Sequence, residues 1–203
     1  MRALLSHPAV YSMFRRLVGR DSTRERYARE HLRVQPGQRV LDIGCGTGDI
    51  LEVLPEVDYT GYDLSPEYIE RARRRFGHRA SFHCAAVDER FSPGTGFDLV
   101  IAHGVLHHLD DGEAATLFRV ARRALSPGGR LVTYDGCFTP DQSMLARLML
   151  KLDRGRHVRS RAAYERLARA EFAEVESFVR HDLIRIPYTH LIMECGTAPP
   201  SRP

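Results

Sequence analysis

The sequence lacks the features that mark membrane-spanning, secreted or metal-binding proteins. None of its apolar runs approaches the ~20 residues of a membrane span, and Met1–Pro8 is too poor in apolar residues for a signal peptide. The four cysteines, Cys45, Cys84, Cys137 and Cys195, lie far apart, without a Cys-x-x-Cys pair or Cys/His ligand spacing. We therefore expect a cytoplasmic protein with reduced thiols, no metal site and no membrane partner.

Lysine is almost absent from the chain. Lys151 is the only lysine among 30 basic residues, and the formal net charge is +4. Because this net charge is small, we attribute the many arginines to the composition of the genome and not to a nucleic-acid partner. The 203 residues, 43% of them hydrophobic, suffice for one domain with a sizeable core, so we expect a single domain over residues 1–203.

The most informative segment is an apolar run that ends in an acid and three glycines. Val40-Leu41-Asp42-Ile43 leads into glycines at positions 44, 46 and 48. Glycine is needed where the backbone takes a positive φ or lies against a ligand, and residues 47–54 can open a helix whose first amides face the same pocket. The spacing GxGxG differs from the GxGxxG that binds a pyrophosphate. Asp42 would repel a pyrophosphate but suits a cationic cofactor with an ammonium group and a sulfonium centre.

This segment, VLDIGCGTG at residues 40–48, resembles the first motif of the class I S-adenosylmethionine-dependent methyltransferases. Three later segments resemble further motifs of that family in the same order, namely Asp58–Asp63, Phe97–Ala102 and Leu125–Val132. The matches run from Arg39 to Asp135, about half of the chain. The resemblance implies S-adenosylmethionine as cofactor and transfer of its methyl group to an oxygen or nitrogen of a small metabolite.

Strand and helix patterns alternate along the chain, which predicts an α/β fold with a doubly wound parallel sheet. The resemblance implies a Rossmann-like, seven-stranded, mostly parallel sheet with helices on both faces, a helical lid and an antiparallel last strand. We expect a helical cap over residues 1–35, a cofactor core over 36–137, a lid insertion over 138–160, and a last helix and strands over 161–203. The other expected elements are helices at Leu4–Val18, Thr23–Leu32, from Pro66, after Asp110 with Glu113 as its capping partner, and Arg161–Ala170, and strands at Ala80–Ala85, Phe172–Val179 and Tyr188–Cys195.

The resemblance also implies which residues contact the cofactor. Asp63 would accept hydrogen bonds from the two ribose hydroxyls. Ala86 stands where many family members carry an acid for the adenine ring, so Asp88, two residues on, is our candidate for that contact. Tyr11 is a candidate for closing over the cofactor carboxylate, with core packing as the alternative. The full expected set is Tyr11, Asp42, Gly44, Cys45, Gly46, Gly48, Asp63, Leu64, Asp88 and His103.

Two histidines follow Phe97–Ala102 in a Leu-His-His sequence that resembles the family's segment beside the acceptor. Removing a proton from a hydroxyl or an ammonium requires a base, and histidine suits this role at neutral pH. His107 and His108 are therefore the candidate catalytic residues, with backbone hydrogen bonding as the alternative role. Asp135, at the end of the fifth expected strand, and His190 are candidate acceptor contacts.

The insertion over residues 138–160 leaves the carboxyl end of a strand, where ligands bind in open α/β sheets. Its helix carries an apolar stripe, Leu145, Leu148, Met149 and Leu152, which we expect to pack on the sheet while the insertion roofs the site. Five basic residues follow or lie within it, namely Lys151, Arg154, Arg156, Arg159 and Arg161. Guanidinium groups match carboxylates and phosphates, so we expect an anionic acceptor held by Arg154 and Arg159. A hydrated surface is the alternative.

Two other functions stay open at this stage. The chain could methylate RNA or protein, although its basic segment lacks the interleaved aromatic residues that stack on bases. It could also bind the cofactor without transferring a methyl group. A small-molecule acceptor is the leading prediction, and the sequence does not specify the acceptor or the oligomeric state.

Overall fold

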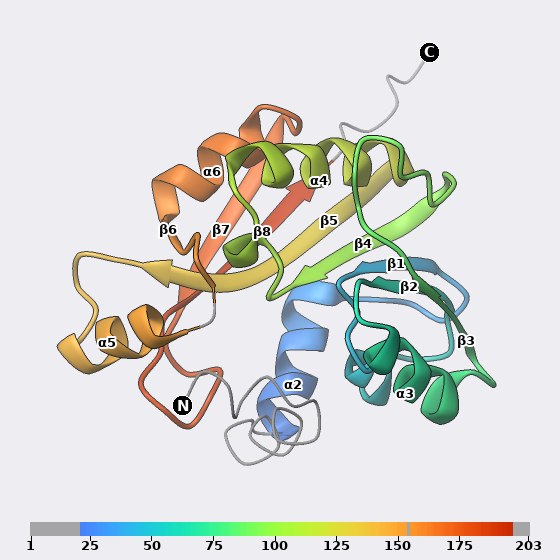
Figure 1. Ribbon diagram of the computed structural model, residues 1–203, viewed down its shortest axis with the longest axis horizontal. Helices are drawn as coiled ribbons and strands as arrows, with labels where there is room; N and C mark the ends of the chain where they lie inside the picture. The colour runs from blue at the N-terminus through green and yellow to red at the C-terminus, as the bar shows by residue number, and fades with distance from the viewer. Residues whose placement is uncertain (1–20, 154, 197–203) are drawn as a thin grey trace.

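The computed structural model describes residues 21–153 and 155–196 (Figure 1). The predicted helix Leu4–Val18, with Tyr11, and the predicted acceptor contact Arg154 lie outside the described residues. At the centre is a sheet with the strand order β3-β2-β1-β4-β5-β8-β7. A two-residue strand, β6 (Arg159–Ser160), pairs with the end of β5, so the sheet has eight strands where we predicted seven.

The first five strands are parallel, and β8 runs antiparallel to both of its neighbours, β5 and β7. This arrangement confirms the predicted Rossmann-like sheet with its antiparallel last strand. The strands of the main path are β1 (Arg39–Ile43), β2 (Asp58–Asp63), β3 (Ala80–Cys84), β4 (Phe97–His103), β5 (Leu125–Phe138), β7 (Glu174–Arg180) and β8 (His190–Gly196).

Helices cover both faces of the sheet, as predicted. Leu41 and Ile43 of β1 pack in one apolar cluster with α4 (Asp111–Ala124) and α6 (Arg161–Arg169). Val40, on the opposite face, packs with α3 (Pro66–Phe76) and with α2 (Asp21–Tyr27), which continues as a π-helical turn, η1 (Ala28–Leu32). Figure 1 shows α4 and α6 on one side of the sheet and α2 and α3 on the other.

Two helix starts follow the capping rules that the sequence indicated. Ser65 accepts a hydrogen bond from the Tyr68 amide at the start of α3. Asp110 and Glu113 form a reciprocal capping box at the start of α4. These caps position the segments just before them, and both segments lie at the carboxyl edge of the sheet.

The prediction that residues 47–54 open a helix is wrong. Only one 3₁₀ turn forms there, η2 (Asp49–Glu52). Gly48 takes a left-handed conformation with φ of 73° just before it, and Pro55 disfavours helical geometry at the residue that precedes it. The helix therefore has no room to extend in either direction.

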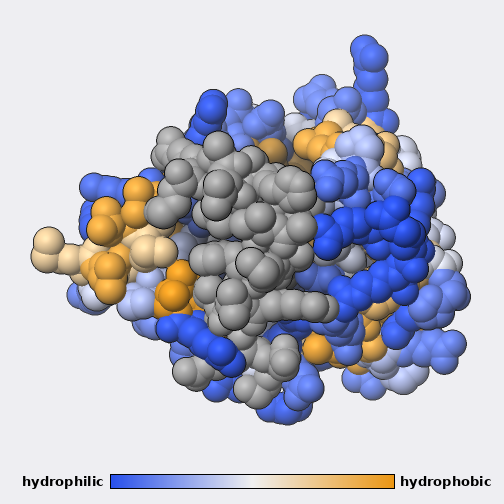
Figure 2. Space-filling model, turned by 60° about the horizontal axis from the view of Figure 1, so that its bottom comes forward, coloured by the Kyte–Doolittle hydropathy of each residue, from blue (hydrophilic) through white to orange (hydrophobic). Residues whose placement is uncertain are grey.

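The predicted packing of the lid helix, α5 (Met144–Leu152), is also wrong. Its buried residues are Ala146 and Leu150, whereas Leu145, Leu148 and Leu152 are about half exposed. The helix lies beyond the carboxyl end of β5 instead of across the sheet face, so only a narrow stripe reaches the core (Figure 1). The exposed side chains form an apolar patch at the edge of the molecule (Figure 2). Within residues 21–153 and 155–196, no helix combines the length and apolar character needed to cross a membrane.

Candidate active site

The glycine turn follows the carboxyl end of β1 and lies beside the carboxyl end of β2. Gly44, Gly46 and Gly48 all have positive φ, at 76°, 54° and 73°, a region that other residues rarely adopt. The amides of Gly44 and Cys45 donate to the carbonyl of Tyr62 at 2.7 and 2.9 Å. These hydrogen bonds fold the turn back over the end of β2.

The glycines serve two different purposes in this turn. A Cβ at Gly46 would meet no atom of the described residues within 4 Å, so among these residues its backbone faces space that a ligand can approach closely. A Cβ at Gly44 would lie 2.4 Å from Cγ2 of Val105, in the loop after β4. Gly44 therefore lets that loop pack directly against the turn.

Asp63 is held in place at the end of β2. Its Oδ2 accepts from the Gly46 amide at 2.9 Å and its Oδ1 from the Ser65 amide at 2.8 Å. Each carboxylate oxygen keeps a further acceptor site for a ribose hydroxyl. Leu64, next in the chain, is 70% exposed and offers an apolar surface beside the carboxylate. The open glycine backbone, the fixed acid and the apolar surface together fit a nucleoside.

Asp42 and Cys45 lie beneath this surface. Asp42 is buried, and its Oδ2 accepts a hydrogen bond from the Tyr59 hydroxyl at 2.5 Å. Burial, with Asp42 and Asp63 nearby, raises the pKa of the Cys45 thiol, so the thiol is neutral. The Cys45 sulfur would lie 2.8 Å from a Cβ at Gly61, which explains the glycine in the middle of β2.

Asp88 lies on the exposed loop after β3, where its Oδ1 accepts from the Arg90 amide at 2.9 Å.

A hydrogen-bonded pair that the sequence analysis missed lies at the carboxyl end of β4. The hydroxyl of Tyr27, from α2, is hydrogen-bonded to Nε2 of His103. Burial raises the pKa of Tyr27 well above its ordinary value, so the phenol is neutral. Both rings lie within 5.6 Å, centroid to centroid, of Tyr134 on β5. The only signal for Tyr27 was its place in an amphipathic helix, one turn before His31.

His107 lies in the turn η3 (Leu106–His108) and is hydrogen-bonded to Asp135. Its Nδ1 is 2.8 Å from Oδ1 of Asp135, and its amide donates to the same oxygen at 3.2 Å. Asp135 is 2% exposed, and burial raises its pKa against the opposing effect of His107. We predicted an acceptor contact for Asp135, but the structure places it beneath the imidazole. His108 is exposed, with its ring centroid 4.1 Å from that of His107.

The far side of the His107 ring faces a second carboxylate. Nε2 of His107 is 3.7 Å from Oδ1 of Asp153, at the end of α5. Asp153 also accepts from the Gly155 amide at 3.0 Å and from the Tyr188 hydroxyl at 2.7 Å. Burial raises the pKa of Asp153, but these two hydrogen bonds, together with the nearby His107 and His108, lower the pKa overall. The sequence analysis missed Asp153, whose only signal is a lone acid among the basic residues of the insertion.

His190 forms part of the aromatic wall beside these residues. Its ring packs on Tyr134 and Tyr188, at centroid distances of 4.5 and 4.6 Å. Burial lowers the pKa of His190 to about 3, so its imidazole is neutral near pH 7. Its Nδ1 is buried and has no hydrogen-bond partner among the described residues.

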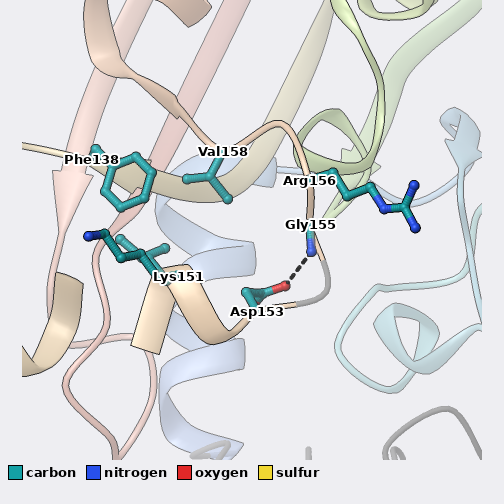
Figure 3. A pocket seen from close by; sticks show the side chains of 7 residues that line it. Phe138, Lys151, Asp153, Gly155, Arg156 and Val158 are labelled. Carbon is teal, nitrogen blue, oxygen red and sulfur yellow. Dashed lines mark hydrogen bonds between the residues drawn. The ribbon is translucent and has the colours of Figure 1, made fainter. Parts of the chain in front are cut away.

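A cavity of about 410 Å³ opens between the end of β5 and the lid insertion (Figure 3). Lys151 and Arg156 supply its positive charge, and neither is paired with an acid in the part of the chain that the structure describes. In Figure 3 the two side chains extend to opposite sides, with Asp153 between them. The residues that line the cavity are Phe138, Leu150, Lys151, Asp153, Gly155, Arg156 and Val158.

The structure does not support an acceptor contact for Arg159. Its side chain is 8% exposed, and its guanidinium faces the loop that carries His107 instead of the cavity. Arg161 is paired with Glu165 at 2.8 Å on the surface of α6. Of the four described basic residues in the predicted cluster, Lys151 and Arg156 line the cavity, and Arg159 and Arg161 do not.

Comparison with known proteins identifies the fold and its cofactor. A protein-family model described as a methyltransferase domain matches residues 41–131. This match and the similarities below support a class I S-adenosylmethionine-dependent methyltransferase. The fold resembles that of a TehB-like S-adenosylmethionine-dependent methyltransferase from Corynebacterium glutamicum, with a TM-score of 0.68 and 21% identity over 95% of this chain and 99% of that one. S-adenosylmethionine is the cofactor of this family.

Two curated relatives are similar over part of this methyltransferase chain. Phosphoethanolamine N-methyltransferase 1 from Arabidopsis thaliana is 34% identical over 55% of this chain and 23% of its own length. The 27-O-demethylrifamycin SV methyltransferase of Amycolatopsis mediterranei is 35% identical over 56% of this chain and 44% of its own length. The chain thus spans less than half of the length of either relative.

Proposed function

We propose that the protein transfers the methyl group of S-adenosylmethionine to an oxygen or nitrogen of a small acceptor, and that His107 takes the acceptor's proton. The observation that carries this proposal is the pair of His107 and Asp135, with Nδ1 and Oδ1 at 2.8 Å. The loop of His107 begins at Val105, which packs against the Gly44 position of the cofactor turn. A proton-accepting group is thereby held next to the site of the cofactor.

The cofactor residues are proposed from the same geometry. Gly44, Cys45, Gly46 and Gly48 would lie against the nucleoside, and Asp63 would bind the ribose, beside Leu64. Asp42 would favour the cationic part of the ligand from beneath the turn, and His103 would border its methionine part. Asp88 completes the set within the described residues, and Tyr11, which lies outside them, is proposed from the sequence alone. When bound, S-adenosylmethionine supplies an electrophilic methyl group on a sulfonium sulfur.

The chain's own residues would then manage the proton. Asp135 bonds Nδ1 of His107, which leaves Nε2 as the nitrogen that can accept a proton from the acceptor O–H or N–H. The lone pair of that oxygen or nitrogen forms the new bond to the methyl carbon, and the sulfur keeps the electrons of the bond that breaks. Asp135 stabilises the imidazolium that results. His108, exposed beside the same ring, is the second candidate base.

An anionic acceptor is favoured by the cavity beside His107. Lys151 and Arg156 are the cations that line it; neither forms an ion pair with a described acid, and with Asp153 as the one acid among the described lining residues the cations outnumber it. One of the curated relatives is named for phosphoethanolamine, which has a phosphate and an amine. We therefore propose a carboxylated or phosphorylated acceptor, with the anion toward Lys151 or Arg156 and the methylated atom toward His107.

The direct test is incubation of the protein with methyl-labelled S-adenosylmethionine and separate pools of small metabolites, RNA and protein. The proposal expects label in a small acidic product and in neither macromolecular pool. Label in RNA or protein would instead support the alternative acceptor classes. Tight binding of S-adenosylmethionine by calorimetry without label in any pool would support a cofactor-binding protein with other chemistry.

A further inference from the structure

We infer that Arg159 is a positioning residue, which holds the loop of His107 in the conformation that methyl transfer requires. The inference rests on the proposed function for its effect on turnover, but the geometry itself is independent of that function. Arg159 lies on β6, 52 positions after His107 in the sequence. Its side chain crosses to the loop after β4 and is 8% exposed there.

The Arg159 guanidinium makes four hydrogen bonds and an ion pair. Nη1 donates to the carbonyls of Leu106 and His157, at 2.9 and 3.0 Å. Nη2 donates to the carbonyl of Leu109 at 2.7 Å and lies 2.7 Å from Oδ1 of Asp111, to which Nε also donates at 2.8 Å. A planar fork with five donors matches this set, whereas an ammonium offers only three donors at one point.

These contacts act on the two residues that flank the histidines. The carbonyls of Leu106 and Leu109, on either side of His107 and His108, are both bound by Arg159. The carbonyl of His107 itself accepts from the His157 amide at 2.9 Å. The segment 155–159 therefore supplies donors to three carbonyls of the histidine loop. The orientation of the His107 ring toward Asp135 and Asp153 depends on that loop.

The other end of the histidine loop is fixed by a different contact. Val105 packs against the backbone of Gly44, so the loop is held between the cofactor turn and Arg159. Within residues 21–153 and 155–196, Arg159 forms no hydrogen bond or ion pair with the glycine turn or with Asp63. Its loss is therefore expected to disturb His107 without removing any group of the proposed cofactor site.

The test compares Arg159→Met and Arg159→Lys with the matched control Arg161→Met, an arginine of the same segment whose partner, Glu165, is on the surface of α6. The measurements are the melting temperature, the dissociation constant of S-adenosylmethionine by calorimetry, kcat, and the imidazole NMR signals of His107. We expect kcat to fall at least about tenfold in both Arg159 variants, more for methionine, with cofactor affinity within about twofold. The His107 signals shift, and the control changes none of these.

A second variant and a chemical rescue experiment test the same role of Arg159. If Arg159→Met does not fold, Asp111→Asn removes the exposed carboxylate partner and should give a smaller change of the same kind. Added guanidinium should partly restore kcat of a folded Arg159→Ala variant. Unshifted His107 signals in a folded Arg159 variant, or unchanged kcat, would overturn the inference. A wild-type protein that never transfers a methyl group would refute the proposed function, while the NMR comparison would still decide the role of Arg159.

Discussion

The backbone of Gly155 lies directly against the imidazole of His107. A Cβ at position 155 would be 2.1 Å from Cδ2 of His107 and 2.9 Å from its carbonyl oxygen. The same glycine donates its amide to Asp153, so the carboxylate facing Nε2 and the residue covering the ring belong to one segment. The lid insertion thus reaches the proposed base through its backbone as well as through its side chains.

Replacing Gly155 by alanine should displace the His107 ring. Forcing a methyl group into this contact is expected to cost about 1–3 kcal/mol of the free energy of unfolding and to reduce kcat. The matched control is Gly112→Ala, where the new Cβ would meet its nearest neighbour at 3.4 Å, an ordinary contact. Urea unfolding and turnover of the two variants provide the comparison. Equal behaviour of both would show that the ring does not require the glycine.

Asp63→Ala should weaken cofactor binding strongly. Two ribose hydroxyls would lose a charged acceptor, and each such hydrogen bond contributes roughly 1.5–3 kcal/mol, or about tenfold or more in affinity. Asp58→Ala, at the exposed start of the same strand, is the control. Calorimetry with S-adenosylmethionine measures both. An affinity of Asp63→Ala within a fewfold of wild type would remove Asp63 from the cofactor site.

The stability of the protein should fall in acid because of His190. The folded-state pKa of His190 is about 3, below the ordinary value of 6.5, so the unfolded chain binds a proton that the folded chain excludes. This contribution is fully present above pH 6.5 and is lost at up to about 1.4 kcal/mol per pH unit as the pH falls from 6.5 toward 3. His190→Gln should flatten that slope, and exposed His78→Gln should not. Urea unfolding between pH 5 and 7.5 measures the slopes, which would be identical if the His190 imidazole were protonated in the folded state.

Lys151→Ala and Arg156→Ala should each raise the KM of an anionic acceptor. They line the cavity without a described acidic partner, and partly exposed ion pairs are screened by salt, so added salt should raise the wild-type KM as well. Cofactor affinity should not change. Exposed Arg166→Ala, on α6, is the control. If neither added salt nor either substitution changes the KM of the acceptor, Lys151 and Arg156 belong to the hydrated surface and do not bind the acceptor.

The sequence predicted the sheet because motif order, strand patterns and caps agree with one another. The glycine turn, Asp63 and the Asp110 cap are local features, and local features are readable from adjacent residues. The pair of His107 and Asp135 brings together the loop after β4 and the end part of β5. The contacts of Arg159 likewise involve residues about 50 positions away in the sequence. Such partners depend on tertiary packing, which is why Arg159 was assigned to the acceptor and why Tyr27 and Asp153 were missed.

The prediction for α5 failed for a related reason. Periodicity shows that Leu145, Leu148 and Leu152 share one helix face, but it does not show what that face meets. In the structure the helix extends past the end of β5 and buries Leu150 instead.

The measurement that tests the account most directly is the single-turnover rate of methyl transfer as a function of pH, at saturating S-adenosylmethionine, with the acceptor found by the labelling screen. The wild-type rate should rise with pH as the base loses its proton. His107→Gln should be slower by about two orders of magnitude and should lose that rise, and Asp135→Asn should be slowed in the same direction, while exposed His78→Gln follows the wild type. A folded His107→Gln variant with the wild-type rate and pH profile would contradict the assignment of His107 as the proton-accepting group.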